Sequence, residues 1–161
     1  MAVRFDAGCL LAVDVGLRTG LALFGCDGRL RWYRSKHFPQ ASALRRAARQ
    51  ILLPLERPTT VCLEGGGALA DAWDRACQSL GIVVMRVAAE EWRGVLLRES
   101  QQRSGKQAKR EADDLARRVI DSSGASRPTS LRHDTSEAIL VGYWAVRSLG
   151  WVKFSERLPK F

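Results

Sequence analysis

The chain has 161 residues, 46% of them hydrophobic, which suits one domain with a sizeable core and argues against global disorder. No apolar run approaches the ~18 residues of a membrane span, and the N-terminus lacks a signal-peptide pattern. We therefore expect a cytoplasmic protein with no membrane partner. The net charge is +9, and 21 of the 26 bases are arginine. Such a basic chain suggests a nucleic-acid partner, with general solubility as the alternative.

The first third of the chain predicts strands. Two short apolar segments bounded by glycines, 9–15 and 19–25, predict a β-hairpin. A more polar, alternating segment, 29–38, predicts a third and partly exposed strand. Asp27-Gly28 lies between the second and third segments and is a favoured two-residue hairpin turn. Together these segments predict a three-stranded antiparallel meander.

The rest of the chain alternates between helical and extended patterns. Helices are predicted over 40–53, 68–80 and 133–148, with a further helical pattern from 89 to about 121 that is broken near Ser104-Gly105, and strands over 59–64 and 82–87. This order predicts an α/β fold: a five-stranded mixed sheet, three antiparallel strands then two parallel, flanked by helices. We expect a single domain over residues 1–161.

Four acidic residues follow or interrupt apolar segments. Asp14 ends the first strand, where its alternative role is to close a turn. Glu64 ends a later strand before three glycines, where a solvated acid beside a flexible loop is the alternative. Asp134 and Glu137 are three residues apart and therefore share one face at the start of the last helix. Acids there also favour the helix dipole, so a structural role is open for this pair.

Carboxylates brought close together raise one another's pKa values unless a cation neutralises them. Oxygen ligands select hard divalent cations such as Mg²⁺ or Mn²⁺ over zinc. Two such ions about 4 Å apart can hold the attacking and leaving oxygens of a phosphodiester displacement. A basic protein with four grouped carboxylates therefore suggests a metal-dependent nuclease.

Three segments, AVDVGLRTGLAL, TVCLEGGG and HDTSEAILVGYWA, resemble in that order the acidic motifs of RuvC-type Holliday junction resolvases, which have an RNase H-like fold. A fourth, EEWRGVLLRESQQRSGKQAKREADDLARRVI, is similar to the family's segment with a tryptophan, a Gly-Lys pair, a further lysine and a long helix. The resemblance covers roughly residues 9–148. It implies a homodimeric endonuclease that resolves four-way DNA junctions by paired phosphodiester hydrolysis, leaving 5′-phosphate and 3′-hydroxyl ends. It also implies two Mg²⁺ ions per active site, with Mn²⁺ able to substitute.

The resemblance assigns roles to particular residues. The catalytic metal ligands would be Asp14, Glu64, Asp134 and Glu137. Glu137 stands where bacterial members commonly have aspartate, as glutamate does in some phage and organellar relatives. His133, one turn before Glu137, would support the metal site or handle a proton, with a surface histidine at a helix start as the alternative. Gly67 replaces an aromatic residue that bacterial members often use to stack on an opened base pair.

The segment 93–118 carries eight bases and four acids around the probable helix break. The candidate DNA contacts are Arg18, Arg93, Lys106, Lys109 and Arg110. A solvated amphipathic helix is the alternative for this segment, because its acids and bases can pair along the helix. Two other functions stay open for the whole chain. One is an RNase H-like nuclease acting on RNA–DNA hybrid or structured RNA, and the other is a branched-nucleic-acid-binding module without catalysis.

Overall fold

The structure is a computed structural model that describes residues 8–54, 57–97 and 105–152. The first three strands, β1 (Cys9–Asp14), β2 (Arg18–Gly25) and β3 (Leu30–His37), form an antiparallel meander. On its other side β1 pairs in parallel with β4 (Thr60–Glu64), which pairs in parallel with β5 (Val83–Val87). The strand order is therefore β3-β2-β1-β4-β5. The predicted five-stranded mixed sheet is confirmed.

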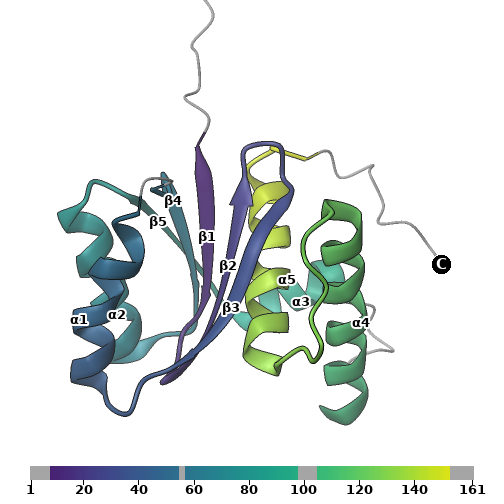
Figure 1. Cartoon of the computed structure of the whole chain (residues 1–161), viewed down its shortest axis with the longest axis horizontal. Coiled ribbons are helices and arrows are strands. Elements are labelled where there is room, and N and C mark those ends of the chain that lie inside the picture. Colours follow the sequence, from purple (N-terminus) through teal and green to yellow (C-terminus); the bar gives the residue numbers. More distant parts are fainter. Residues whose placement is uncertain (1–7, 55–56, 98–104, 153–161) are drawn as a thin grey trace, which may run out of the picture.

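Helices cover both faces of this sheet (Figure 1). One face carries α1 (Ala41–Leu52) and α2 (Gly67–Ser79), and the other carries α3 (Ala89–Leu96), α4 (Gly105–Ser123) and α5 (His133–Ser148). The break predicted near Ser104-Gly105 agrees with the start of α4, while residues 98–104 lie outside the described part. In the ranges that the structure describes, no helix is long and apolar enough to cross a bilayer.

Side-chain alternation along the central strands fixes which face each residue serves. In β1, Leu11 and Val13 pack with the α1–α2 layer, whereas Leu10 and Ala12 pack with α5. The next residue in this alternation, Asp14, therefore lies on the α5 face at the carboxyl end of the strand. The same alternation in β4 places Glu64 on the α5 face as well, because Cys62 packs with α5 and Leu63 packs on the opposite side.

Two glycines allow α5 to lie very close to the sheet. A Cβ atom on Gly20 of β2 would stand 1.8 Å from the carbonyl oxygen of Asp134. A Cβ atom on Gly142 of α5 would stand 2.2 Å from a ring carbon of Phe24. Neither contact leaves room for a side chain, so these glycines set the distance between α5 and the strands beneath it.

The connection between β2 and β3 differs from the prediction. The backbone N–H of Gly25 donates to the carbonyl of Arg29 at 2.9 Å, so three residues, 26–28, form the turn. Gly28 supplies the left-handed backbone conformation, with φ +74°. The Asp27-Gly28 pair does lie in the turn, but the predicted two-residue turn is wrong because Cys26 is also left out of the strand pairing.

Candidate active site

Asp14 and Glu64 are neighbours across the parallel β1–β4 pairing. They are register partners at the carboxyl ends of their strands, and both face α5. The pairing continues one residue further, where the Val15 N–H donates to the Glu64 carbonyl at 3.0 Å. Backbone hydrogen bonds therefore place these two acids side by side, although 50 residues separate them in the chain.

The surroundings of Asp14 oppose its ionisation. Burial, the largest cause, and a hydrogen bond with the Glu64 carboxyl raise the pKa of Asp14 to about 8 from its ordinary value of 3.8. The negative charges of Glu64, Glu137 and Asp134 make smaller contributions to the same rise in pKa. All four predicted acids therefore act on one another at this edge of the sheet. At neutral pH, Asp14 holds a proton unless a cation joins the group.

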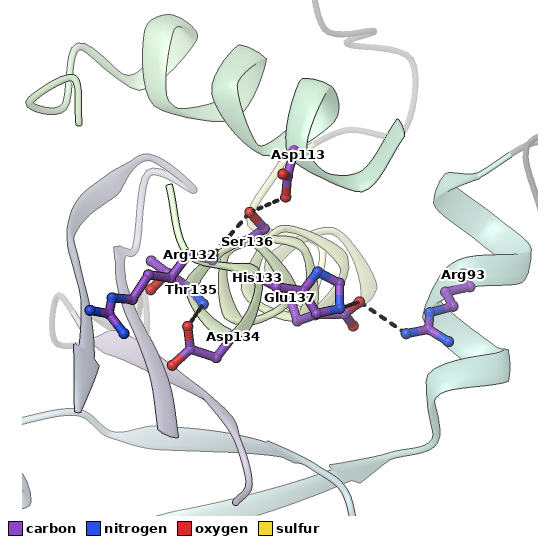
Figure 2. Close-up of polar contacts among 8 residues, drawn as sticks. All are labelled: Arg93, Asp113, Arg132, His133, Asp134, Thr135, Ser136 and Glu137. Atoms are coloured by element: carbon purple, nitrogen blue, oxygen red, sulfur yellow. Dashed lines mark hydrogen bonds and ion pairs between the residues drawn. The ribbon is translucent and has the colours of Figure 1, made fainter. Parts of the chain in front are cut away.

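Glu137 projects from the first turns of α5 toward α3 (Figure 2). It is only 5% exposed, and its Oε1 accepts a hydrogen bond from the Arg93 guanidinium at 2.9 Å. The His133 Nε2 lies 3.2 Å from the same oxygen, one helical turn away. Burial is the main cause that raises the pKa of Glu137, with Glu64 adding to it, while Arg93 and His133 act in the opposite direction.

Asp134 points away from Glu137, toward the strands (Figure 2). One of its carboxylate oxygens accepts the backbone N–H of Thr135 at 2.9 Å, and the other accepts the hydroxyl of Ser35 on β3. Behind them, the Ser136 hydroxyl donates to Asp113 of α4 at 2.6 Å. The two acids of α5 are therefore held by side chains from two other elements, β3 and α3.

The donor set fits a hard divalent cation. It consists of carboxylate oxygens, and the pKa values of Asp14 and Glu137 are raised mainly by burial, with the charge of Glu64 adding to both. Across residues 8–54, 57–97 and 105–152, no three acid, histidine or cysteine side chains already form a metal-binding group. In this arrangement Glu137 is directed to Arg93 and Asp134 to Ser35.

The predicted DNA contacts lie around the same end of the molecule. Arg18 is exposed at the start of β2, four residues after Asp14. Lys106, Lys109 and Arg110 are exposed on the first turns of α4, whose N-terminus lies at the same end as the start of α5 (Figure 1). Arg93 differs from these four because it contacts Glu137 rather than only facing solvent.

Sequence reasoning missed Gly20 and Ser35. Gly20 had a readable signal, because a glycine inside a buried strand marks the close approach of another backbone. Ser35 had none, since its contact with Asp134 spans 99 residues and depends on how α5 docks. Among the tryptophans, Trp73 and Trp92 are fully buried, whereas Trp32 is half-buried.

A hollow of about 460 Å³ adjoins Glu64, the one acid of the candidate site that lines it. The rest of its lining consists of the two glycines after Glu64 and residues 86–91. Gly67, at the start of α2, has φ +76° and open space around its Cβ position. An aromatic side chain at this position would strain the backbone by about 1–2 kcal/mol. The backbone conformation at Gly67 therefore favours glycine over the aromatic residue found at this position of the resembled family.

The strand order and the helices on both faces of the sheet form an RNase H-like fold. The structure is similar to T. thermophilus RuvC in complex with a Holliday junction substrate, with TM-score 0.60 and 17% identity over 89% of this chain and 96% of that one. It is also similar to the yeast mitochondrial Holliday junction resolvase Ydc2, with TM-score 0.55 and 11% identity over 90% and 82% of the two chains. Comparison of the sequence with protein-family models and with curated proteins gave no match.

Proposed function

We propose that this chain is a metal-dependent endonuclease that cuts branched DNA, with the four-way junction as its substrate. The observation that carries the proposal is the pairing of Asp14 with Glu64, facing two further acids on α5 whose charges act on Asp14. The two similar structures support the choice of substrate, because one is bound to a Holliday junction and the other is a Holliday junction resolvase.

The metal ligands in this proposal are Asp14, Glu64, Asp134 and Glu137. When bound, two Mg²⁺ ions would activate water and stabilise the leaving oxygen of the phosphodiester. Asp14 would hold the metal in its ionised form, and Glu137, whose Oε1 accepts a hydrogen bond from Arg93 in this structure, would turn from Arg93 to the metal. Arg93 is then available to a DNA phosphate beside the acids. Arg18 and the basic start of α4 hold the adjoining DNA backbone without reading its bases.

A four-way junction needs two symmetric cuts, so the proposal includes a homodimer with two such sites. The basic charge of the chain supports polyanion binding but does not select a substrate. The expected products carry 5′-phosphate and 3′-hydroxyl ends. Light scattering on the protein with and without junction DNA measures the oligomeric state independently of cleavage.

The test is cleavage of a labelled four-way junction beside a linear duplex, with Mg²⁺ and with EDTA. We expect cuts in the junction only with the metal, and a loss of at least about 10³-fold for Asp14→Asn, which removes a metal ligand. Asp27→Asn is the matched control, because Asp27 lies in the β2–β3 turn at the opposite end of the sheet. No cleavage by the wild type, or equal cleavage by Asp14→Asn, would reject the proposal.

The open space and glycine backbone at Gly67 favour a second candidate function, because a site without the stacking aromatic has less to select an opened junction. In this alternative the same acids cut RNA–DNA hybrid. Hybrid, duplex and junction substrates compared at equal concentration separate the two functions. Faster cleavage of the hybrid than of the junction would favour the alternative.

A further inference from the structure

The strongest concentration of positive charge lies outside the predicted DNA contacts. Residues 28–54, which span β3 and α1, contain seven lysines and arginines and no acid. Their net charge of +7 compares with +9 for the whole chain. The segment 93–118 has eight bases but also four acids, so its net charge is only +4. A polyanion therefore meets the least repulsion along β3 and α1.

This basic region contains a groove of about 320 Å³ between β3 and α1. Its apolar wall includes the half-buried Trp32 and Ile51, and its rim carries Arg34 and Lys36, both exposed. The guanidinium of Arg34 lies over the indole of Trp32, 4.8 Å from the ring centroid. An apolar floor with a stacked aromatic–guanidinium pair and a basic rim suits an unpaired nucleobase with its phosphates.

The groove is connected to the acids through β3. Successive residues of a strand point to opposite faces, so Arg34 and Lys36 face α1 while Ser35 faces α5. The Ser35 hydroxyl donates to Asp134. β3 is an edge strand, so no further strand of the sheet lies beside it on its outer side. A nucleic-acid strand that leaves the acids can therefore pass over this edge into the groove.

We propose that the β3–α1 groove binds a single-stranded stretch of nucleic acid, with one base against the Trp32–Arg34 pair and the flanking phosphates on Arg34 and Lys36. The link to the acids rests on the proposed nuclease function, but the binding itself does not. Where a branched substrate carries an unpaired strand beside the cut, this groove holds that strand. The ligand class is single-stranded DNA or RNA without sequence preference.

The experiment measures the anisotropy of a fluorescein-labelled oligothymidine of about 12 nucleotides, in EDTA and over a range of salt. We expect Trp32→Leu to weaken binding by about 5- to 100-fold through the loss of stacking. Lys36→Gln removes a phosphate contact and reduces the slope of log K against log[salt] by about 0.7. Arg34→Lys keeps the charge and loses the planar group, so affinity falls while the salt slope stays unchanged.

Arg75→Gln is the matched control, because Arg75 is exposed on α2, and α2 contacts β5, the edge strand opposite β3. We expect it to leave oligothymidine binding unchanged. Since Trp32 contributes to packing, the exposed Arg34 and Lys36 keep the test valid if Trp32→Leu is unstable. Equal affinities and salt slopes for wild type, Arg34→Lys and Lys36→Gln would overturn the proposal. Binding of anionic lipid vesicles without oligothymidine binding would overturn it too.

The outcomes separate this inference from the proposed function. Oligothymidine binding in EDTA needs no metal and no cut. A protein that binds through the groove but does not cleave junctions would reject the nuclease proposal alone. A protein that cleaves junctions while the groove variants bind normally would reject the groove alone.

Discussion

The two pairs of acids in the candidate site are held in different ways. Asp14 and Glu64 are placed by the β1–β4 hydrogen bonds, and one residue of register shift would turn either acid to the other face. Asp134 and Glu137 are placed by a helix whose side-chain partners come from β3, α3 and its own first turn. The strand pair is therefore fixed by the backbone, and the helix pair by docking and by exchangeable side-chain contacts.

This difference assigns separate tasks to the two pairs. The strand pair is held by backbone hydrogen bonds, so it can keep its geometry whether or not its charge is neutralised. The helix pair instead makes contacts with Arg93, His133 and Ser35. In the proposed function, the rigid strand pair and the adjustable helix pair together would let the site bind cations without distorting the sheet.

Gly20→Val tests the docking of α5 and is expected to lower both cleavage and stability. A side chain at Gly20 meets the Asp134 carbonyl, so the start of α5 must move while β1 and β4 keep their register. We expect junction cleavage to fall by about 10²-fold, the cost of misplacing reacting groups by about 1 Å. The free energy of unfolding in urea should fall by about 1–3 kcal/mol through overpacking.

The control for this variant is Gly94→Ala in α3, where a Cβ meets nothing within 4 Å. Replacing glycine by alanine inside a helix should raise the free energy of unfolding by about 0.5–1 kcal/mol. If Gly20→Val left cleavage and stability unchanged, the position of the helix acids would not depend on contact with β2.

Arg93→Met tests how the helix pair, Asp134 and Glu137, is held. It leaves the buried carboxyl of Glu137 without its guanidinium partner, which should lower the free energy of unfolding by about 1–3 kcal/mol at pH 8. Losing Arg93 raises the pKa of Glu137 further, and the protonated form is lost as pH rises, so the defect should be smaller at pH 5. Urea unfolding at both pH values measures it.

A double-mutant cycle isolates this ion pair from other contacts of Arg93. In a Glu137→Gln background, Arg93→Met should cost less than it does in the wild type, because no buried charge is left behind. Equal costs in both backgrounds at pH 8 would show that Arg93 stabilises the fold through other partners.

Asp14→Asn tests the strand pair through pH. Because the folded pKa of Asp14, about 8, exceeds the ordinary value of 3.8, the protonated carboxyl stabilises the fold fully below pH 3.8. That stability is lost as pH rises through about 8. Asparagine stays neutral, so in EDTA at pH 9 we expect its Tm to exceed that of the wild type by about 4 °C, with the difference vanishing near pH 4.

Asp27→Asn should show the opposite sign. Burial acts to raise the pKa of Asp27, but hydrogen bonds from the Arg29 N–H and the Arg31 guanidinium outweigh it and lower the pKa. Its charged form therefore supports the fold at neutral pH, and the variant should be slightly less stable there. A rising Tm for both variants would mean that the effect of Asp14→Asn is not specific to the acid group.

Much of this architecture could be predicted from local sequence patterns. Short continuous apolar runs that end in or near an acid predict Asp14 and Glu64 at strand ends, and the three-residue spacing predicts that Asp134 and Glu137 share a helix face. The contacts of these acids with Ser35 and Arg93 could not be predicted, because they depend on how α5 and α3 pack on the sheet.

The basic groove was readable in the sequence and was nevertheless missed. The segment 93–118 supplies most of the predicted DNA contacts because its lysines lie beside a helix break. The acid-free run 28–54 is predicted only as a strand and an amphipathic helix. Net charge over a segment needs the acids subtracted as well as the bases counted. What the sequence could not supply is the position of Trp32 beside α1, which only the packed sheet creates.

The parallel β1–β4 pairing also has a consequence for folding. Joining Asp14 to Glu64 closes a loop of about 50 residues, a slow and non-local step compared with the hairpins of β1, β2 and β3. A chain that has formed only this meander holds a single carboxylate of the strand pair. The acids therefore assemble only when the centre of the sheet is complete, so under the proposed function an incompletely folded chain would not cut nucleic acid.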